Sequence, residues 1–285
     1  MNTVNILRKE LKKIAEPKRA GVLQGFFKTG IGEYGEGDVF LGITVPRLRK
    51  IAIKFKDLDF ASIEKMLRSK FHEERLIALL ILVGNFNIGD GKKQKKIFDF
   101  YLKNTKYINN WDLVDLSADK IVGKYLWNSM TRSLPHVASD ARLELSKIQT
   151  HRRSLSERLF STSSKAKINN QTAFSSLANG QTPRPLIKFA KSKNLWERRI
   201  AILATFQFIK NDRFEETLEI AETLFNDKHD LIQKAVGWML REVGKRNLKI
   251  ETEFLDKFYK KMPRTMLRYA IEKFPKDIGT SYLGR

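Results

Sequence analysis

Cysteine is absent from this chain of 285 residues, and histidine is scarce. Without cysteine there is no disulfide, thiolate zinc site, iron–sulfur cluster or cysteine nucleophile. The four histidines are His72, His136, His151 and His229, and no two of them are spaced i,i+4 as metal ligands on one helix would be. The sequence therefore predicts an enzyme or binding protein that uses neither a metal nor another cofactor.

Long apolar runs are missing as well. The longest, residues 77–83, is far too short to cross a bilayer. The basic segment 1–27 has no uninterrupted apolar stretch of the kind that secretion signals carry. We expect no membrane association and a cytoplasmic location, on the nucleoid if the protein is bacterial.

Acidic residues are few relative to basic ones. Lys and Arg number 54 against 32 Asp and Glu, which gives a formal net charge of +22. A hydrophobic content of 42% with 19 phenylalanines describes a folded chain rather than a basic disordered tail. An excess of positive charge on a folded chain indicates a polyanionic partner, above all nucleic acid.

Helical periodicity dominates the chain, and strand-like alternation is rare. Four segments follow one sequence pattern, at residues 72–80, 195–203, 229–237 and 264–271. A fifth segment, residues 112–118, fits the same pattern. Ala201, Ala235 and Ala270 occupy the same slot, 34 and 35 positions apart. Second helices are expected between the copies, at 92–104, 214–226 and 250–262. This period predicts an all-α solenoid of HEAT-like helix pairs, as one domain over 1–285. An irregular helical bundle is the alternative.

A tryptophan and an acid share one face of a predicted helix. Trp111 and Asp115 are four residues apart, and Asn109 or Asn110 can cap the start of their helix. The apolar stripe beside them consists of Val114, Ala118, Ile121 and Val122. One interpretation is a core tryptophan and an acid that favours the helix dipole. The other is a site at which a cation is formed or held.

Basic residues occupy equivalent helices of the repeat, which a solenoid places along one concave wall. They are Arg75, Arg198, Arg199, Lys234, Arg241, Lys245, Arg264 and Arg268. Trp238 lies one helical turn beyond Lys234. A wall of this kind predicts salt-sensitive DNA binding through phosphates, although a basic face can also be only solvated.

Five motifs carry a resemblance to a known family: residues 40–46, 111–115, 195–201, 237–242 and 262–270. In these motifs the chain resembles the bacterial DNA alkylation repair family of HEAT-like DNA glycosylases, the AlkD type. The resemblance implies an α-solenoid that excises positively charged N3- and N7-alkylated purines from duplex DNA without flipping the base.

The resemblance also implies roles for individual residues. Asp115 matches the catalytic carboxylate, and Trp111 and Trp238 match the aromatic pair around the deoxyribose of the lesion. Arg199 matches the arginine that holds the DNA backbone close to the acid. Lys234 and Arg241 are similar to further phosphate contacts, and Phe26 stands where the family can present a tyrosine. By their place in the repeat, Arg198, Lys245, Arg264 and Arg268 are also expected to bind DNA.

Physical chemistry independently favours these residue types. A cationic alkylpurine leaves readily without a general acid, and positive charge then develops on the sugar. Asp115 would stabilise that oxocarbenium ion and orient water, while Arg199 keeps the carboxylate ionised. The two tryptophan rings add about 1–2 kcal/mol each of cation–π attraction. No lysine stands out as a Schiff-base nucleophile, so a monofunctional enzyme is expected. Its expected partner is double-stranded DNA that contains alkylated bases, and the enzyme is expected to act as a monomer.

Residues from about 128 to 182 lie outside the resemblance. This insertion is serine-rich and basic; its first part, through residue 148, has the rhythm of an amphipathic helix, and residues 161–183 are polar. A DNA-gripping loop, a partner-binding element and a tolerated surface insertion are its three interpretations. For the whole chain, a non-catalytic binder of branched or distorted DNA is the main alternative function, and a protein-interaction scaffold is a weaker one. The carboxylate of Asp115 favours the enzyme, because a pure DNA binder gains nothing from it.

Overall fold

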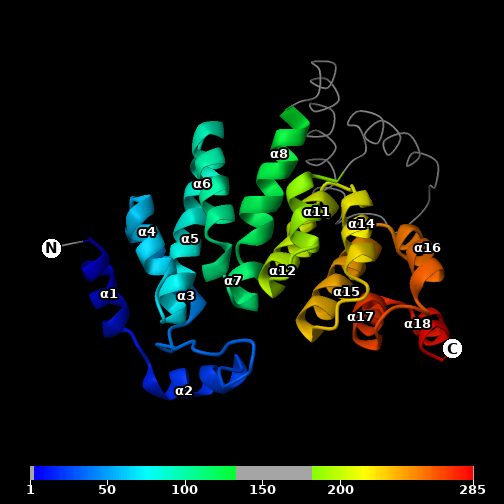
Figure 1. Cartoon of the computed structure of the whole chain (residues 1–285), viewed down its shortest axis with the longest axis horizontal. Coiled ribbons are helices and arrows are strands. Elements are labelled where there is room, and N and C mark those ends of the chain that lie inside the picture. Colours follow the sequence, from blue (N-terminus) through cyan, green and yellow to red (C-terminus); the bar gives the residue numbers. More distant parts are fainter. Residues whose placement is uncertain (1–2, 133–181, 285) are drawn as a thin grey trace, which may run out of the picture.

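The computed structural model describes residues 3–132 and 182–284, which form an all-α solenoid. In Figure 1 the helices follow one another across the molecule from the N-terminus to the C-terminus. Their bounds are α1 Thr3–Lys13, α2 Pro17–Phe26, α3 Val45–Lys54, α4 Phe60–Leu67, α5 His72–Ile88, α6 Gly91–Lys103, α7 Trp111–Asp115, α8 Lys124–Arg132, α11 Arg184–Ala190, α12 Leu195–Ala204, α13 Phe206–Ile209, α14 Glu215–Thr223, α15 Asp230–Gly244, α16 Leu248–Phe258, α17 Arg264–Ala270 and α18 Lys276–Leu283. The predicted fold class is confirmed.

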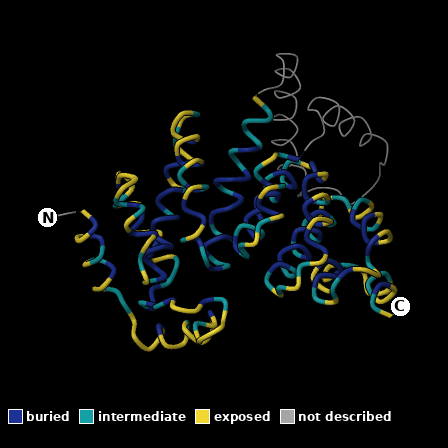
Figure 2. Tube along the Cα trace, viewed as in Figure 1, coloured by how far each residue is buried: buried dark blue, intermediate teal, exposed yellow. Residues whose placement is uncertain are grey.

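The expected copies of the repeat pack side by side. α5 contacts α7, α7 contacts α12, α12 contacts α15, and α15 contacts α17. The second helices predicted between them correspond to α6, α14 and α16. Ala201, Ala235 and Ala270 are buried, because a methyl group is what the close approach of neighbouring helices leaves room for. One apolar core runs through the stack, with exposed residues at its edges (Figure 2).

The helix predicted to run on from Trp111 is interrupted. α7 is followed by a π-helical turn, η2, at Asp119–Gly123, and then by α8. A β-carbon at Gly123 would lie 2.2 Å from the Ala204 carbonyl oxygen, so glycine allows this turn to approach α12 closely. The predicted apolar stripe, from Val114 to Val122, is nevertheless fully buried.

α2 and the segment that follows it lie at one end of the array, below α3 and α5 in Figure 1, and are largely exposed in Figure 2. The Glu73 carboxylate on α5 accepts hydrogen bonds from the backbone N–H groups of Leu41, Gly42 and Ile43 at 2.8, 2.8 and 3.1 Å. Gly42 has a φ of +81°, and a β-carbon there would lie 2.2 Å from the Glu16 carbonyl oxygen. The segment before α3 is thus fixed against the start of α5.

The predicted insertion falls mostly on residues that the structure does not describe. Residues 128–132 belong to α8, so the start placed at 128 lies inside a helix. The amphipathic helix expected through residue 148 and the polar part up to residue 181 lie outside the described residues. Over 3–132 and 182–284, none of the helices combines the length and the apolar character that a membrane span requires.

Glu251 on α16 is a buried acid remote from the candidate site. It is 1% exposed, and its Oε1 has no hydrogen-bond partner among the described residues. Burial raises the pKa of Glu251 to about 9, against the opposing effect of the Arg241 guanidinium. The folded protein therefore holds a proton that the unfolded chain releases above its ordinary pKa of about 4.5.

Glu251→Gln is expected to remove part of the pH dependence of stability. Because the folded-state pKa is raised, the wild type loses stability as the pH rises from about 4.5 to about 9, by up to about 1.4 kcal/mol per pH unit. The glutamine variant should lack this slope. Urea unfolding of both proteins at pH 5 and pH 6.5 measures it. Equal slopes in the two proteins would contradict the assignment.

Candidate active site and DNA-binding face

The start of α7 is fixed by Asn110, one of the two asparagines expected to cap it. The Asn110 Oδ1 accepts the backbone N–H of Trp111 at 2.8 Å, and its Nδ2 donates to Asp38 Oδ2 at 3.0 Å. Asn110 is fully buried. Trp111 and Asp115 form the two ends of this five-residue helix and lie on the same face of it, as predicted.

Asp115 forms a bidentate ion pair with Arg199 of α12. The Arg199 Nε and Nη2 atoms donate to Asp115 Oδ1 and Oδ2, both at 2.8 Å. The third arginine nitrogen, Nη1, donates to the Leu231 carbonyl oxygen at the start of α15 at 2.5 Å. Arg199 is only 5% exposed, so this one side chain joins α7, α12 and α15. Its guanidinium contacts the acid directly rather than standing free for phosphate.

The charge of Asp115 depends on two opposing effects. Burial raises the pKa of the Asp115 carboxyl, and the Arg199 guanidinium lowers it. The neighbouring carboxylates of Asp112 and Asp119 add to the rise. The net direction is upward. Arg199 therefore favours the ionised form, as expected from the sequence, but it offsets the burial only in part.

Aromatic rings surround Trp111 on the side of α2. Phe27 stacks on Trp111 with ring centroids 5.0 Å apart and planes 12° apart, and Phe40 stacks on Phe27 at 4.9 Å. Phe26 meets Trp111 edge-on at 6.0 Å and is 63% exposed. Phe26, which stands where the family can present a tyrosine, thus lies next to Trp111 with most of its ring accessible.

Tyr34, between α2 and α3, is a residue of this site that the sequence reasoning missed. Its ring meets Trp196 of α12 edge-on at 6.3 Å. Burial raises the pKa of the Tyr34 hydroxyl, and a hydrogen bond with the Trp111 side chain lowers it. Gly35 makes the position possible, because a β-carbon there would lie 2.4 Å from the Phe27 carbonyl oxygen. The sequence feature that could have indicated a tight turn here is the set of closely spaced glycines at positions 30, 32, 35 and 37.

Trp238 lies on α15, the helix beyond α12. Its ring meets Phe206 of α13 at 6.4 Å, and its indole N–H donates to Glu242 Oε1 at 3.1 Å. α12 packs against both α7 and α15 and lies between them in Figure 1. The two tryptophans are therefore on opposite sides of the Arg199 helix, and no ring contact joins them within the described residues.

Two arginines predicted to line the groove are engaged in the fold instead. Arg198 pairs with Asp227 at 2.5 Å and donates to the carbonyl oxygens of Ser192 and Lys193 at 3.0 Å. Arg75 is buried and pairs with Asp38 at 2.6 Å. The repeat register places an arginine on a helix, but it does not identify the acid with which the side chain pairs.

The other predicted DNA-binding cations lie on α15, α17 and the residue after α15. Lys234 pairs with Asp230 at 2.6 Å and Lys245 with Glu242 at 2.7 Å, and both remain more than one third accessible. Arg241 is paired with Glu272 and mostly covered. Arg264 and Arg268 are exposed. The pairs of Lys234 and Lys245 join residues on neighbouring turns at the surface, so they leave these two cations available to an incoming phosphate at low cost.

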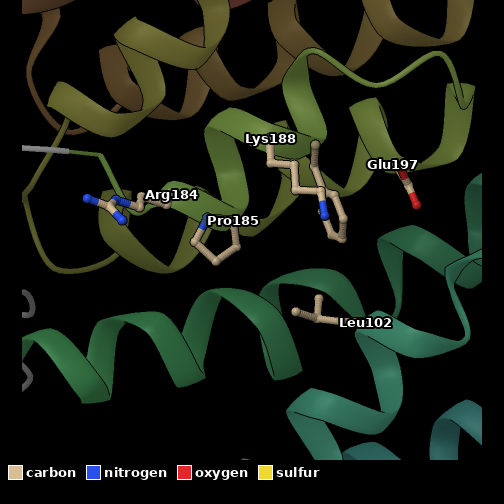
Figure 3. A pocket seen from close by; sticks show the side chains of 6 residues that line it. Leu102, Arg184, Pro185, Lys188 and Glu197 are labelled. Atoms are coloured by element: carbon tan, nitrogen blue, oxygen red, sulfur yellow. The ribbon is translucent and has the colours of Figure 1, made fainter.

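A pocket of about 440 Å³ is lined by residues other than Asp115. It is lined from α6, α11 and α12 by Leu102, Arg184, Pro185, Lys188, Phe189 and Glu197 (Figure 3). Glu197 and Arg199 are two residues apart on α12 and therefore face opposite sides of that helix. In the part of the chain that the structure describes, no group of three acidic or histidine side chains could hold a metal.

Comparisons with known proteins agree with this architecture. The family model described as DNA alkylation repair enzyme matches residues 7–144 and 169–274. It thus extends into both ends of the predicted insertion and leaves 145–168 unmatched. A solved structure described as "Predicted DNA alkylation repair enzyme from Enterococcus faecalis" shares 15% identity at a TM-score of 0.58, over 92% of this chain and 97% of that one, which supports the fold. None of the curated proteins matches the chain.

Proposed function

Since the chain belongs to the family of DNA alkylation repair enzymes, we propose that it is a monofunctional DNA glycosylase that excises cationic N3- and N7-alkylpurines from duplex DNA. The observation that carries the proposal is the half-buried carboxylate of Asp115, held by Nε and Nη2 of the Arg199 guanidinium one helical turn from Trp111. A protein that only binds DNA has no use for a carboxylate placed on a phosphate-facing surface. In this proposal the glycosylase acts on the duplex as a monomer.

The reaction needs a negative charge beside the sugar and no proton donor for the base. As the N-glycosidic bond breaks, its electron pair goes to the purine, which leaves neutral, and the sugar becomes an oxocarbenium ion. Asp115 stabilises that ion and orients the water that attacks it. Arg199 serves this chemistry by holding the carboxylate in place and by favouring its ionised form.

Aromatic side chains supply the remaining walls. Trp111 and Trp238 flank the Arg199 helix and cup the deoxyribose of the lesion, with cation–π attraction to the developing charge. Phe26, exposed beside Trp111, contacts the sugar or the base from α2. The Tyr34 hydroxyl, close to the indole of Trp111, provides the polar group that Phe26 lacks. Excision without base flipping fits a carboxylate that does not line the pocket of about 440 Å³.

Binding of the duplex is assigned to the accessible cations of α15 and α17. Lys234, Lys245, Arg264 and Arg268 neutralise phosphates on one side of Asp115, and Arg241 joins them when its pair with Glu272 opens. Arg198 is left out because Asp227 and two carbonyl groups already occupy it. Such contacts make the affinity fall steeply with salt.

Arg199→Ala and Lys234→Ala are expected to fail in different ways. Without Arg199 the pKa of the Asp115 carboxyl rises further, and excision should fall about tenfold for each unit by which that pKa exceeds the assay pH. The excision rate of this variant should then rise with pH. Lys234→Ala should instead make the slope of log affinity against log salt shallower by about one unit, with a much smaller loss of single-turnover rate.

These two variants distinguish the effect of the Asp115 charge on the excision rate from the effect of phosphate contacts on DNA affinity. Single-turnover release of 7-methylguanine from a duplex measures the first effect, and binding between 50 and 200 mM salt measures the second. If Arg199→Ala keeps the wild-type rate at pH 6, Arg199 does not maintain the charge of the acid. If Lys234→Ala leaves the salt slope unchanged, Lys234 lies off the phosphate path.

A further inference from the structure

A buried histidine bridges two aspartates directly behind the candidate site. His72 is the first residue of α5 and is 2% exposed. Its Nδ1 lies 3.1 Å from Asp38 Oδ2, and its Nε2 lies 2.8 Å from Asp112 Oδ2. Asp38 lies in the same segment as Tyr34, between α2 and α3, and Asp112 follows Trp111 in α7. The one imidazole ring therefore connects both sides of the site.

The same ring belongs to the aromatic stack behind Trp111. His72 stacks on Phe40 with ring centroids 4.5 Å apart, and lies 5.2 Å from Phe27, which itself stacks on Trp111. A change in the charge or tilt of His72 thus reaches Trp111 by two routes, through Asp112 and through Phe27.

The charges around His72 require it to be a cation. A neutral imidazole has one N–H and can donate to one carboxylate, whereas an imidazolium donates to both. The other group that faces the bridge is Arg75, which also pairs with Asp38 at 2.6 Å. Asp112 receives no such second cation, and its Oδ1 is buried with no hydrogen-bond partner among the described residues. A neutral His72 would donate to only one of the two carboxylates and would turn an imidazole lone pair toward the other.

We propose that the His72 imidazolium is a positioning residue, which ties Asp38 to Asp112 and so holds Trp111 and Asp115 in place for excision. The inference rests on the proposed glycosylase function. Loss of the proton releases one carboxylate, so the tie between Asp38 and Asp112 opens and Trp111 and Asp115 are no longer held in place. Excision should decline as the solution becomes alkaline.

The bridge itself is tested by titration of the wild-type protein. The two carboxylates outweigh burial and raise the pKa of His72 to about 8, whereas burial lowers the pKa of His229 below 6.5. We expect one of the four histidine ring signals in the NMR spectrum to titrate near pH 8. Its assignment follows from His72→Gln, or from replacing His136, His151 and His229 in turn if that variant does not fold.

Fluorescence reports whether the titration reaches Trp111. The difference between the wild type and Trp111→Phe should change with the same midpoint as the His72 signal. A His72 signal that titrates at or below pH 6.5, or a Trp111 fluorescence that does not follow it, would overturn the proposal.

The effect on excision is tested with a matched pair of acids. Asp112→Asn removes a carboxylate that holds the His72 proton, so the alkaline decline of the excision rate should move to lower pH by about one unit or more. Asp119→Asn is the control: Asp119 also raises the pKa of Asp115, but it pairs with Lys210 at 2.7 Å rather than with His72. That variant should keep the midpoint of the decline.

The outcomes distinguish this inference from the proposed function. A midpoint that stays in place in Asp112→Asn, or that moves equally in both variants, would overturn the role of His72. If the wild type releases no base at any pH, the glycosylase function fails. A His72 signal near pH 8 that moves with Trp111 fluorescence would still support the bridge.

Discussion

Asp115→Asn is expected to abolish release of the alkylated base while DNA affinity stays the same or rises. Asparagine keeps the shape of the side chain but removes the negative charge that stabilises the sugar cation, so the rate should fall by a factor on the order of 100 or more. The substitution also frees the Arg199 guanidinium, which both carboxylate oxygens of Asp115 hold in the wild type. Removal of a negative charge near the bound phosphates lowers their repulsion, which favours binding.

The measurement pairs single-turnover base release with a binding titration on the same duplex. Asp119→Asn is a suitable control, because it removes a nearby acid whose partners are Lys210 and Lys120 rather than Arg199. Thermal unfolding of each variant checks that the fold survives, since Asp115→Asn leaves a buried arginine without its counter-charge. Excision at the wild-type rate in Asp115→Asn would show that another group carries the chemistry.

The identity of the lesion should matter even more than any single side chain. If Asp115 stabilises a sugar cation and no group protonates the departing base, only bases that already carry positive charge leave readily. We therefore expect excision of 7-methylguanine and 3-methyladenine, and no excision of uracil, hypoxanthine or 8-oxoguanine. Neutral bases of this kind require a general acid or a fitted pocket.

Bulky cationic adducts extend the same prediction. Asp115 does not line the pocket of about 440 Å³ between α6, α11 and α12, so the walls of that pocket do not limit the size of the base. Competition between a methyl and a bulkier cationic N7 adduct in otherwise identical duplexes measures the tolerance, with uracil and hypoxanthine duplexes assayed beside them. Robust release of either neutral base would mean that a base-reading pocket exists.

The fold could be read from the sequence because each repeat leaves an apolar stripe that only a neighbouring copy can cover. Ala201, Ala235 and Ala270 occupy equivalent positions of this stripe, and the structure buries all three. The π turn after α7 was not predicted, because it depends on the approach of Gly123 to the Ala204 carbonyl, a contact between segments far apart in the chain. Periodicity describes one helix at a time.

The candidate site was predictable where its residues share a helix. Trp111 and Asp115 are related by local spacing alone, and the family resemblance supplied Arg199. His72 and Tyr34 were missed because their importance arises from tertiary contacts with Asp112 and Trp111. Arg198 was assigned to DNA because its helix position is right, whereas the direction of its side chain is set by Asp227, 29 residues away.

The central claim is that this protein breaks the glycosidic bond of an alkylated purine rather than merely binding the damaged duplex. The most direct test incubates the purified full chain with a duplex carrying a single 7-methylguanine, and quantifies both the bound DNA and the free base over time. The account predicts free 7-methylguanine well above spontaneous depurination for the wild type, and bound DNA without free base for Asp115→Asn. Tight binding by the wild type with base release at only the spontaneous rate would contradict it and would identify a non-catalytic DNA-binding protein.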